Sequence, residues 1–173
     1  MGLGGLLDST NVVVPEVSVI TNVAMDHMKY CGNTIEEIAV QKAGIIKEGV
    51  PVVTTAEEPA LSVIARKAYE MKSRLYALDR SFDVVGNAGP ADPAVGQMVT
   101  VRERYGRDIT ATIPLMGKHQ RVNCAAAVMA LLLIASREKR LTRTALERGL
   151  AQVRWPGRFQ VLRCGGVDVV IDG

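Results

Sequence analysis

A chain of 173 residues, 48% of them hydrophobic, is long enough to bury one ordinary globular core without disulfides or structural metals. The formal net charge of +3 comes from interspersed charges of both signs, and only 4% of the residues are aromatic, so we expect no nucleic-acid partner. The three cysteines, Cys31, Cys124 and Cys164, are separate in the sequence, and no signal-peptide pattern is present, so we expect a protein of the reducing cytoplasm. No apolar run is long enough to cross a bilayer, so we expect no membrane partner.

The first half of the chain alternates between strand and helix patterns. Residues 17–23 are rich in β-branched side chains and predict a buried strand. Thr34, followed by Glu37 at the capping-box spacing, predicts the start of an amphipathic helix. A second strand is expected at 50–54 and a second amphipathic helix at 61–68. This order is typical of a parallel sheet with flanking helices.

The second half predicts a small antiparallel part followed by more helices. Alternating residues from Val99 to Tyr105 lead to a turn at Gly106, after which 109–113 is expected to return antiparallel. We therefore expect a three-layer α/β fold with a mainly parallel sheet and a small antiparallel appendage at about 75–113. The remaining expected elements are a helix at 119–135 that is apolar nearly all round, a shorter helix after Thr142, and strands at 159–162 and 167–171.

Both ends of the chain are unusual for a domain boundary. The chain opens on Gly2-Leu3-Gly4-Gly5 and stops at Asp172-Gly173, where a strand should pass residues to a loop. We interpret residues 1–173 as a single domain that is truncated on both sides.

Two residues of the first half stand where chemistry is plausible. His27 follows a predicted strand, where loops at the carboxyl end of a parallel sheet hold ligands, so it is a candidate metal ligand or acid/base; a capping or surface histidine is the alternative. Lys42 falls on the apolar stripe of its helix, and a buried ammonium must be paired, deprotonated or modified. Alternatively, its stem lies along the core and its amine reaches solvent.

The second half offers a candidate anion site. His119, Gln120 and Asn123 lie at the start of a buried helix, where free backbone N–H groups could hold an anion or a nucleotide, although simple capping explains them equally well. Arg158 follows a rigid Pro-Gly turn that could direct its guanidinium at phosphate oxygens, or it is a plain surface arginine. The opening glycines precede no Gly-Lys-Ser/Thr, so by themselves they predict only a turn.

Together these segments resemble the folylpolyglutamate synthase/dihydrofolate synthase branch of the muramyl-ligase superfamily along almost the whole chain. The matching motifs are Gly2 to Gly5 with Leu7-Asp8-Ser9-Thr10-Asn11, Ile20-Thr21-Asn22 to Asp26-His27, Ile38-Ala39 to Lys42-Ala43-Gly44-Ile45-Ile46-Lys47, Gly117-Lys118-His119-Gln120 with Asn123, Trp155-Pro156-Gly157-Arg158, and Ile171-Asp172-Gly173.

The resemblance implies the central ATP-binding domain of a ligase that uses ATP and Mg²⁺. In such a ligase ATP phosphorylates a carboxylate of folate or dihydropteroate, and the amine of L-glutamate attacks the acyl phosphate to form an amide. By the resemblance, His27 and a carbamylated Lys42 hold metal, and these two residues and Arg158 act in catalysis. The same resemblance implies that the nucleotide is bound by His119, Gln120, Asn123, Arg158 and Asp172. It also implies that Asp8 belongs to the folate-side pocket.

The chain also departs from the family pattern. The glycine-rich phosphate loop, a glutamate expected just before Met1 and the glutamate-binding C-terminal domain are absent, and Leu6 stands where relatives usually carry arginine. We therefore expect this chain by itself not to turn over, and we expect its parent to be a monomer. Another amino-acid ligase of the superfamily, or a non-catalytic binding module whose site residues are remnants, are the alternatives.

Overall fold

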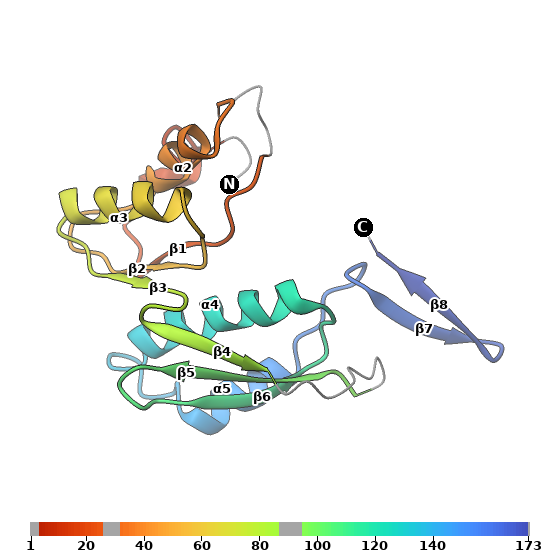
Figure 1. Cartoon of the computed structure of the whole chain (residues 1–173). Coiled ribbons are helices and arrows are strands. Elements are labelled where there is room, and N and C mark those ends of the chain that lie inside the picture. The colour runs from red at the N-terminus through yellow and green to blue at the C-terminus, as the bar shows by residue number, and fades with distance from the viewer. Residues whose placement is uncertain (1–3, 26–31, 87–94, 173) are drawn as a thin grey trace. The chain divides into compact units, whose positions relative to one another are not determined.

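The computed structural model describes residues 4–25, 32–86 and 95–172. Its internal contacts divide the chain into two compact units, Met1–Ser81 and Phe82–Gly173, and each unit is described by itself. Figure 1 follows the chain from the red N-terminal residues to the blue C-terminal ones. The single domain expected from the composition stays a prediction.

A three-stranded parallel sheet forms the centre of the first unit. Its strands are β1 (Ser18–Ile20), β2 (Val52–Thr54) and β3 (Leu75–Ala77). β2 lies in the middle and pairs in parallel with both neighbours, so that Val53 stands opposite Val19 and Tyr76. Every residue of β2 is buried, as expected for the central strand of a covered parallel sheet.

Helices α2 (Ile35–Ala43) and α3 (Ala60–Glu70) pack on each other and lie over this sheet (Figure 1). The hydroxyl of Thr34 accepts a hydrogen bond from the backbone N–H of Glu37 at 3.2 Å, which is the predicted helix start. The Glu37 carboxylate accepts from the N–H of Asn33 at 2.6 Å, one residue earlier than in the standard capping box. Ile38 and Ile64 are almost fully buried where the helices meet the core.

The second unit contains an antiparallel sheet, two helices and a hairpin. The sheet has β5 (Gln97–Glu103) between β4 (Phe82–Gly86) and β6 (Ile109–Ile113). Helix α4 (Lys118–Ile134) packs on β4 and β5, and α5 (Arg143–Ala151) packs on β6. Strands β7 (Gln160–Cys164) and β8 (Val167–Ile171) form the C-terminal hairpin. Within the described part of the chain, no helix is both long and apolar enough to cross a membrane.

The predicted α/β class, with a parallel sheet, flanking helices and a small antiparallel sheet, is confirmed. The antiparallel part begins at Phe82 and not at about Leu75 as expected, because Leu75–Ala77 adds to the parallel sheet beside β2. A strand of three residues is too short to show a hydrophobic period, so sequence patterns could not separate it from the next sheet.

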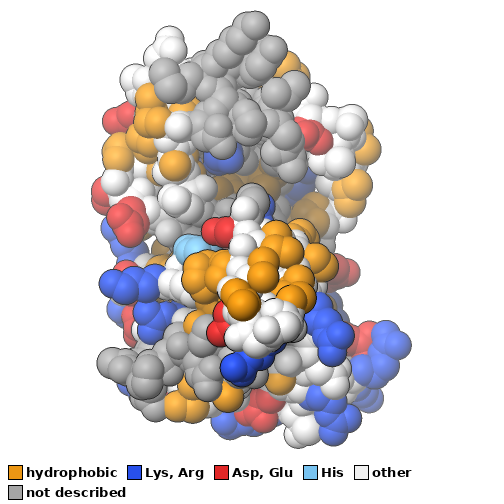
Figure 2. Space-filling model, turned by 90° about the vertical axis from the view of Figure 1, so that its right-hand side faces the viewer, with side chains coloured by type: hydrophobic (Ala, Val, Ile, Leu, Met, Phe, Trp, Pro, Cys, Tyr) orange, Lys and Arg blue, Asp and Glu red, His pale blue; other side chains and the backbone are white. Residues whose placement is uncertain are grey.

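The C-terminal hairpin exposes many apolar side chains. Figure 2 shows hydrophobic side chains gathered at the centre of one face, where this hairpin is nearest the viewer. The exposed large residues of this region are Trp155, Phe159, Leu162, Val167, Val169, Val170 and Ile171. The hairpin therefore contributes little buried surface to the core of its unit.

An ion pair between a buried carboxylate and a half-exposed arginine ties the β5–β6 turn to α4. The side chain of Glu103 is only 1% exposed, and its carboxylate accepts a hydrogen bond from Nε of Arg107 at 2.9 Å. Nη1 of Arg107 also donates to the backbone oxygen of Leu132 in α4 at 3.2 Å. Arg107 thus both neutralises a buried carboxylate and satisfies a helix carbonyl.

We predict that Arg107→Met destabilises the second unit by about 3 kcal/mol, because the stem remains but the Glu103 carboxylate loses its charged partner. The matched control is Arg102→Met. Its pair with Asp108 spans 3.4 Å between side chains that are 57% and 40% exposed, and its loss should cost less than about 0.5 kcal/mol. Denaturant unfolding measures both variants, and equal losses would contradict the prediction.

Candidate functional site

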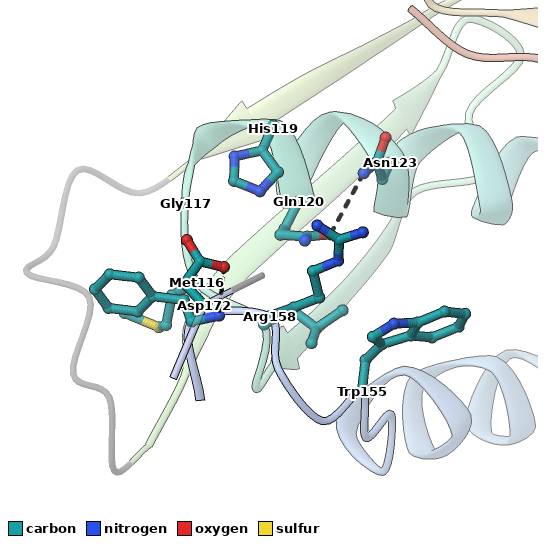
Figure 3. Close-up of a pocket in the computed structure, with 10 residues that line it drawn as sticks. Met116, Gly117, His119, Gln120, Asn123, Trp155, Arg158 and Asp172 are labelled. Atoms are coloured by element: carbon teal, nitrogen blue, oxygen red, sulfur yellow. Dashed lines mark hydrogen bonds between the residues drawn. The ribbon is translucent and has the colours of Figure 1, made fainter. Parts of the chain in front are cut away.

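A pocket of about 960 Å³ lies in the second unit between the start of α4 and the C-terminal hairpin (Figure 3). The residues that line it are Leu115, Met116, Gly117, His119, Gln120, Asn123, Trp155, Arg158, Phe159 and Asp172. They come from three places in the sequence: the loop and first turns of α4, the turn that precedes β7, and the residue that follows β8.

The first wall of this pocket is the N-terminus of α4. Gly117 is the residue before the helix, with φ 101°, and it makes no side-chain capping bond. The His119 ring lies against it, since a Cβ on Gly117 would come within 2.7 Å of the His119 Cε1. Nδ2 of Asn123 donates to Oε1 of Gln120 at 3.4 Å, so two amide side chains are held side by side. An uncapped helix start carries a partial positive charge and attracts anions.

The second wall is the turn that contains Arg158. The backbone N–H of Gly157 donates to Oε1 of Gln160 at 3.1 Å, and that of Phe159 donates to Oδ1 of Asp172 at 3.1 Å. These bonds attach the turn to the first residue of β7 and to the end of β8. In Figure 3 the Arg158 side chain extends from this turn toward the first turns of α4.

The chemistry of the pocket suits a ligand with an anionic end and a flat apolar end. A guanidinium and a helix N-terminus both attract phosphate or carboxylate oxygens. Trp155, Phe159 and Met116 offer apolar surface, and the Asp172 carboxylate can accept a hydrogen bond.

The structure brings together all five residues that the sequence linked to an anion or nucleotide, namely His119, Gln120, Asn123, Arg158 and Asp172. Leu115, Met116 and Phe159 also line the pocket, although no sequence pattern singled them out. Phe159 has φ 48°, a conformation that is rare for an aromatic residue and that no pattern indicates. For Leu115 and Met116 a signal was available, since Met116 directly precedes Gly117.

A second pocket, of about 220 Å³, lies in the first unit and includes Lys42. Its lining residues are Gly4, Gly5, Val19, Ile20, Thr21, Asn22, Lys42 and Ile45. Lys42 is half-buried in the last turn of α2, and Thr21 and Asn22 directly follow β1. The backbone N–H of Gly5 donates to the oxygen of Gln41 at 2.9 Å, which holds the opening glycines against the helix end.

Asp8 lines neither of these pockets and has a local structural role. Its Oδ1 accepts from the backbone N–H of Thr10 at 2.9 Å and from the Thr10 hydroxyl at 2.6 Å, so it caps the short 3₁₀ helix Ser9–Val12. Nδ2 of Asn11 then donates to the oxygen of Gly44 at 3.1 Å, which ties this segment to the end of α2.

The predicted metal ligand His27 lies outside the described residues. Among the residues that are described, no three His, Cys, Asp or Glu side chains are grouped so that they could hold a metal ion. The structure therefore shows the surroundings of Lys42 but leaves the rest of the predicted metal site a prediction.

Comparison with known proteins gives a consistent result. The Mur ligase middle domain matches residues 2–131. The chain is 40% identical to folylpolyglutamate synthase of Lacticaseibacillus casei over 175 residues, which is all of this chain and 40% of that protein. It is also 40% identical to the dihydrofolate synthase/folylpolyglutamate synthase of Bacillus subtilis (strain 168) over 165 residues, 94% of this chain and 37% of the relative. The chain thus spans about 40% of the length of these curated relatives.

Solved structures agree with this assignment. An FPGS–AMPPCP–folate complex is similar with a TM-score of 0.87 and 38% identity, over 99% of this chain and 42% of that one. Folylpolyglutamate synthase from Thermotoga maritima is similar with a TM-score of 0.84 and 32% identity, over 99% of this chain and 38% of that one.

We predict opposite effects for two glycine substitutions in the second unit. Gly117→Ala should lower the free energy of unfolding by about 1–2 kcal/mol and displace the His119 ring. The residue has φ 101°, and its new methyl group would contact that ring. Gly149→Ala should raise the free energy of unfolding by about 0.5–1 kcal/mol, because it lies inside α5 and the added carbon would have open space beyond its chain neighbours and the helix's own backbone. Thermal unfolding and the His119 ring proton shifts test this, and a stabilised Gly117→Ala would refute it.

We also predict that one of the two described thiols is protected by burial in α4. Burial raises the pKa of the Cys124 thiol to about 11, since the thiolate is disfavoured away from water, whereas Cys164 is exposed. In a Cys31→Ser variant, one thiol should react with DTNB at pH 8 and the second only after denaturation. Two fast thiols in the folded variant would show that α4 does not bury Cys124.

Proposed function

We propose that this chain, which belongs to the Mur ligase middle-domain family in its folylpolyglutamate synthase/dihydrofolate synthase branch, is the central ATP-binding part of a ligase that joins L-glutamate to folate or dihydropteroate. The observation that supports this most is the pocket of about 960 Å³ in which the start of α4 faces Arg158 and Asp172. Such a pocket suits a nucleotide, and two of the similar FPGS structures are complexes with the ATP analogue AMPPCP.

The proposed reaction has two steps. The γ-phosphoryl group of ATP passes to a carboxylate oxygen of the folate substrate, giving ADP and an acyl phosphate. The amine of L-glutamate then attacks the carbonyl carbon, an amide bond forms, and phosphate leaves together with a proton from the amine. The protein's part is to position the reactants and to neutralise phosphate charge.

Five of the residues that line the pocket have a proposed role in holding ATP. Arg158 places its guanidinium against the γ-phosphate, because a guanidinium can form two parallel charge-assisted hydrogen bonds to phosphate oxygens. His119, Gln120, Asn123 and Asp172 orient the nucleotide through hydrogen bonds, since they line the same pocket. The uncapped start of α4 adds the attraction of its backbone N–H groups.

Lys42 is proposed to act as a carbamate. Its amine adds to carbon dioxide with loss of a proton, which replaces a cation with an anionic oxygen donor. Mg²⁺ prefers oxygen ligands, and among the described side chains that line this pocket, those of Thr21 and Asn22 are the ones that carry oxygen. An ammonium there would repel Mg²⁺, so the pocket fits this ion only when Lys42 is modified. The carbamate, with His27, would hold Mg²⁺, which neutralises phosphate charge when bound.

Asp8 is proposed to shape the folate side of the site indirectly. Its carboxylate already accepts two hydrogen bonds from Thr10, so its contribution is to fix the segment that follows the opening glycines. We further propose that the whole ligase is a monomer of the reducing cytoplasm, the compartment that the separate cysteines favour.

The test is a chimera in which residues 1–173 replace the matching segment of the L. casei enzyme. It should hydrolyse ATP only when both folate and L-glutamate are present. Lys42→Ala and Arg158→Ala in the chimera should each lower kcat about 100-fold or more, because each removes charge stabilisation at the phosphates. The control Lys67→Ala removes a lysine from α3 whose partner is Glu70 at 3.6 Å, and it should keep full activity.

Several results would contradict this proposal. Full activity of Lys42→Ala would remove the carbamate from the mechanism. Dependence on a different amino acid would identify another ligase of the same superfamily. A chimera that binds ATP but never turns over would favour a non-catalytic remnant, the reading to which Leu6 points.

A further inference from the structure

The loop that leads into α4 is held by one side chain from the neighbouring sheet. Nε2 of Gln97 donates to the backbone oxygen of Leu115 at 2.6 Å and to that of Gly117 at 2.9 Å. Gln97 is the first residue of β5 and is half-buried, with Ile113 opposite it in the sheet. One amide group therefore bridges the two ends of a three-residue stretch that lines the large pocket.

The backbone is shaped so that Gln97 can reach this loop. Gly96 has φ 97°, and a Cβ there would collide with the backbone oxygen of Ile113. Only glycine permits so close an approach of the start of β5 to the end of β6. This approach brings the Gln97 side chain to the carbonyl groups that follow Pro114.

The same carbonyl that Gln97 holds also begins α4. The oxygen of Gly117 accepts a hydrogen bond from the backbone N–H of Gln120 at 3.2 Å, in addition to the bond from Gln97. Gly117 cannot cap the helix, because it has no side chain. Gln97 consequently fixes the direction in which the first turn of α4, with His119 and Gln120, faces the pocket.

We propose that Gln97 is a positioning residue for nucleotide binding, a role that rests on the proposed function of the large pocket. It touches no ligand; it holds the Leu115 and Gly117 carbonyls so that the N–H groups and side chains of the first helical turn point at the bound phosphates. This role of Gln97 requires a side chain of glutamine's length that donates two hydrogen bonds. A side chain that only packed against the loop would not need the donors.

Two substitutions separate donation from packing. Gln97→Met keeps the length and volume but donates nothing. Gln97→Glu keeps the shape, but at neutral pH it only accepts hydrogen bonds and places a negative charge against two carbonyl oxygens. If Gln97 served only to fill space, Gln97→Met would behave as wild type. The matched control is Gln152→Met, at the exposed end of α5 and outside the pocket lining.

The chain contains its own reporter for this experiment. Trp155 is the only tryptophan of the sequence, and it lines the pocket, so its fluorescence can follow titration with Mg²⁺–AMPPCP. We expect Gln97→Met to raise the Kd about tenfold, because binding must then order a loop that Gln97 no longer holds, and Gln97→Glu to raise it further. The Kd of Gln152→Met should equal that of wild type.

A second readout does not depend on the ligand. Amide hydrogen exchange at Gln120 should be faster in Gln97→Met than in wild type, because its acceptor carbonyl is no longer held, while exchange in the middle of α4 stays unchanged. If Gln97→Met had the Kd and the Gln120 exchange rate of the wild type, the positioning role of Gln97 would be wrong. The nucleotide assignment of the pocket would then be unaffected. A wild-type chain that binds no AMPPCP would overturn the nucleotide assignment of the pocket, and the inference with it.

Discussion

The start of α4 is a helix terminus at which the capping residue has no side chain. Gly117 is there because the chain turns at φ 101° and because the His119 ring occupies the space of a Cβ. The N–H groups of the first turn are therefore available to something other than a cap, and the rest of the pocket is organised around them. Gln97 holds the turn from the sheet side, and the Arg158 turn faces it from the hairpin side.

The two units contribute different kinds of chemistry. The second unit offers a large pocket with a guanidinium, a helix start and apolar surface, which suits a nucleotide. The first unit offers a small polar pocket at the carboxyl end of β1, and among its described lining residues Lys42 has the only charged side chain. The proposed carbamylation of this half-buried lysine would add an anionic oxygen donor to the neutral oxygens of Thr21 and Asn22.

The sequence predicted most of what depends on local pattern. The capped start of α2 at Thr34 and the hairpin of β5 and β6 were visible as spacings, and His119, Gln120, Asn123 and Arg158 of the large pocket were recognised as candidates for an anion site. It could not predict what depends on long-range contacts. The three-residue strand Leu75–Ala77 is defined by its neighbour β2 and not by its own pattern, and the hold of Gln97 on Gly117 joins residues 20 positions apart. The local cap made by Asp8 also shows why a residue that matches a family motif need not point into a site.

The bond between Phe159 and Asp172 closes the C-terminal hairpin at its open end and makes one wall of the pocket dependent on strand register. A shift of one residue between β7 and β8 would turn every side chain to the other face and carry the Asp172 carboxylate away from the Arg158 turn. The two-residue connection at Gly165 and Gly166, both with positive φ, helps to set that register, because turn type and loop length fix how the strands of a hairpin pair. The position of the Asp172 carboxylate in the pocket therefore depends on a glycine turn at the opposite end of the hairpin.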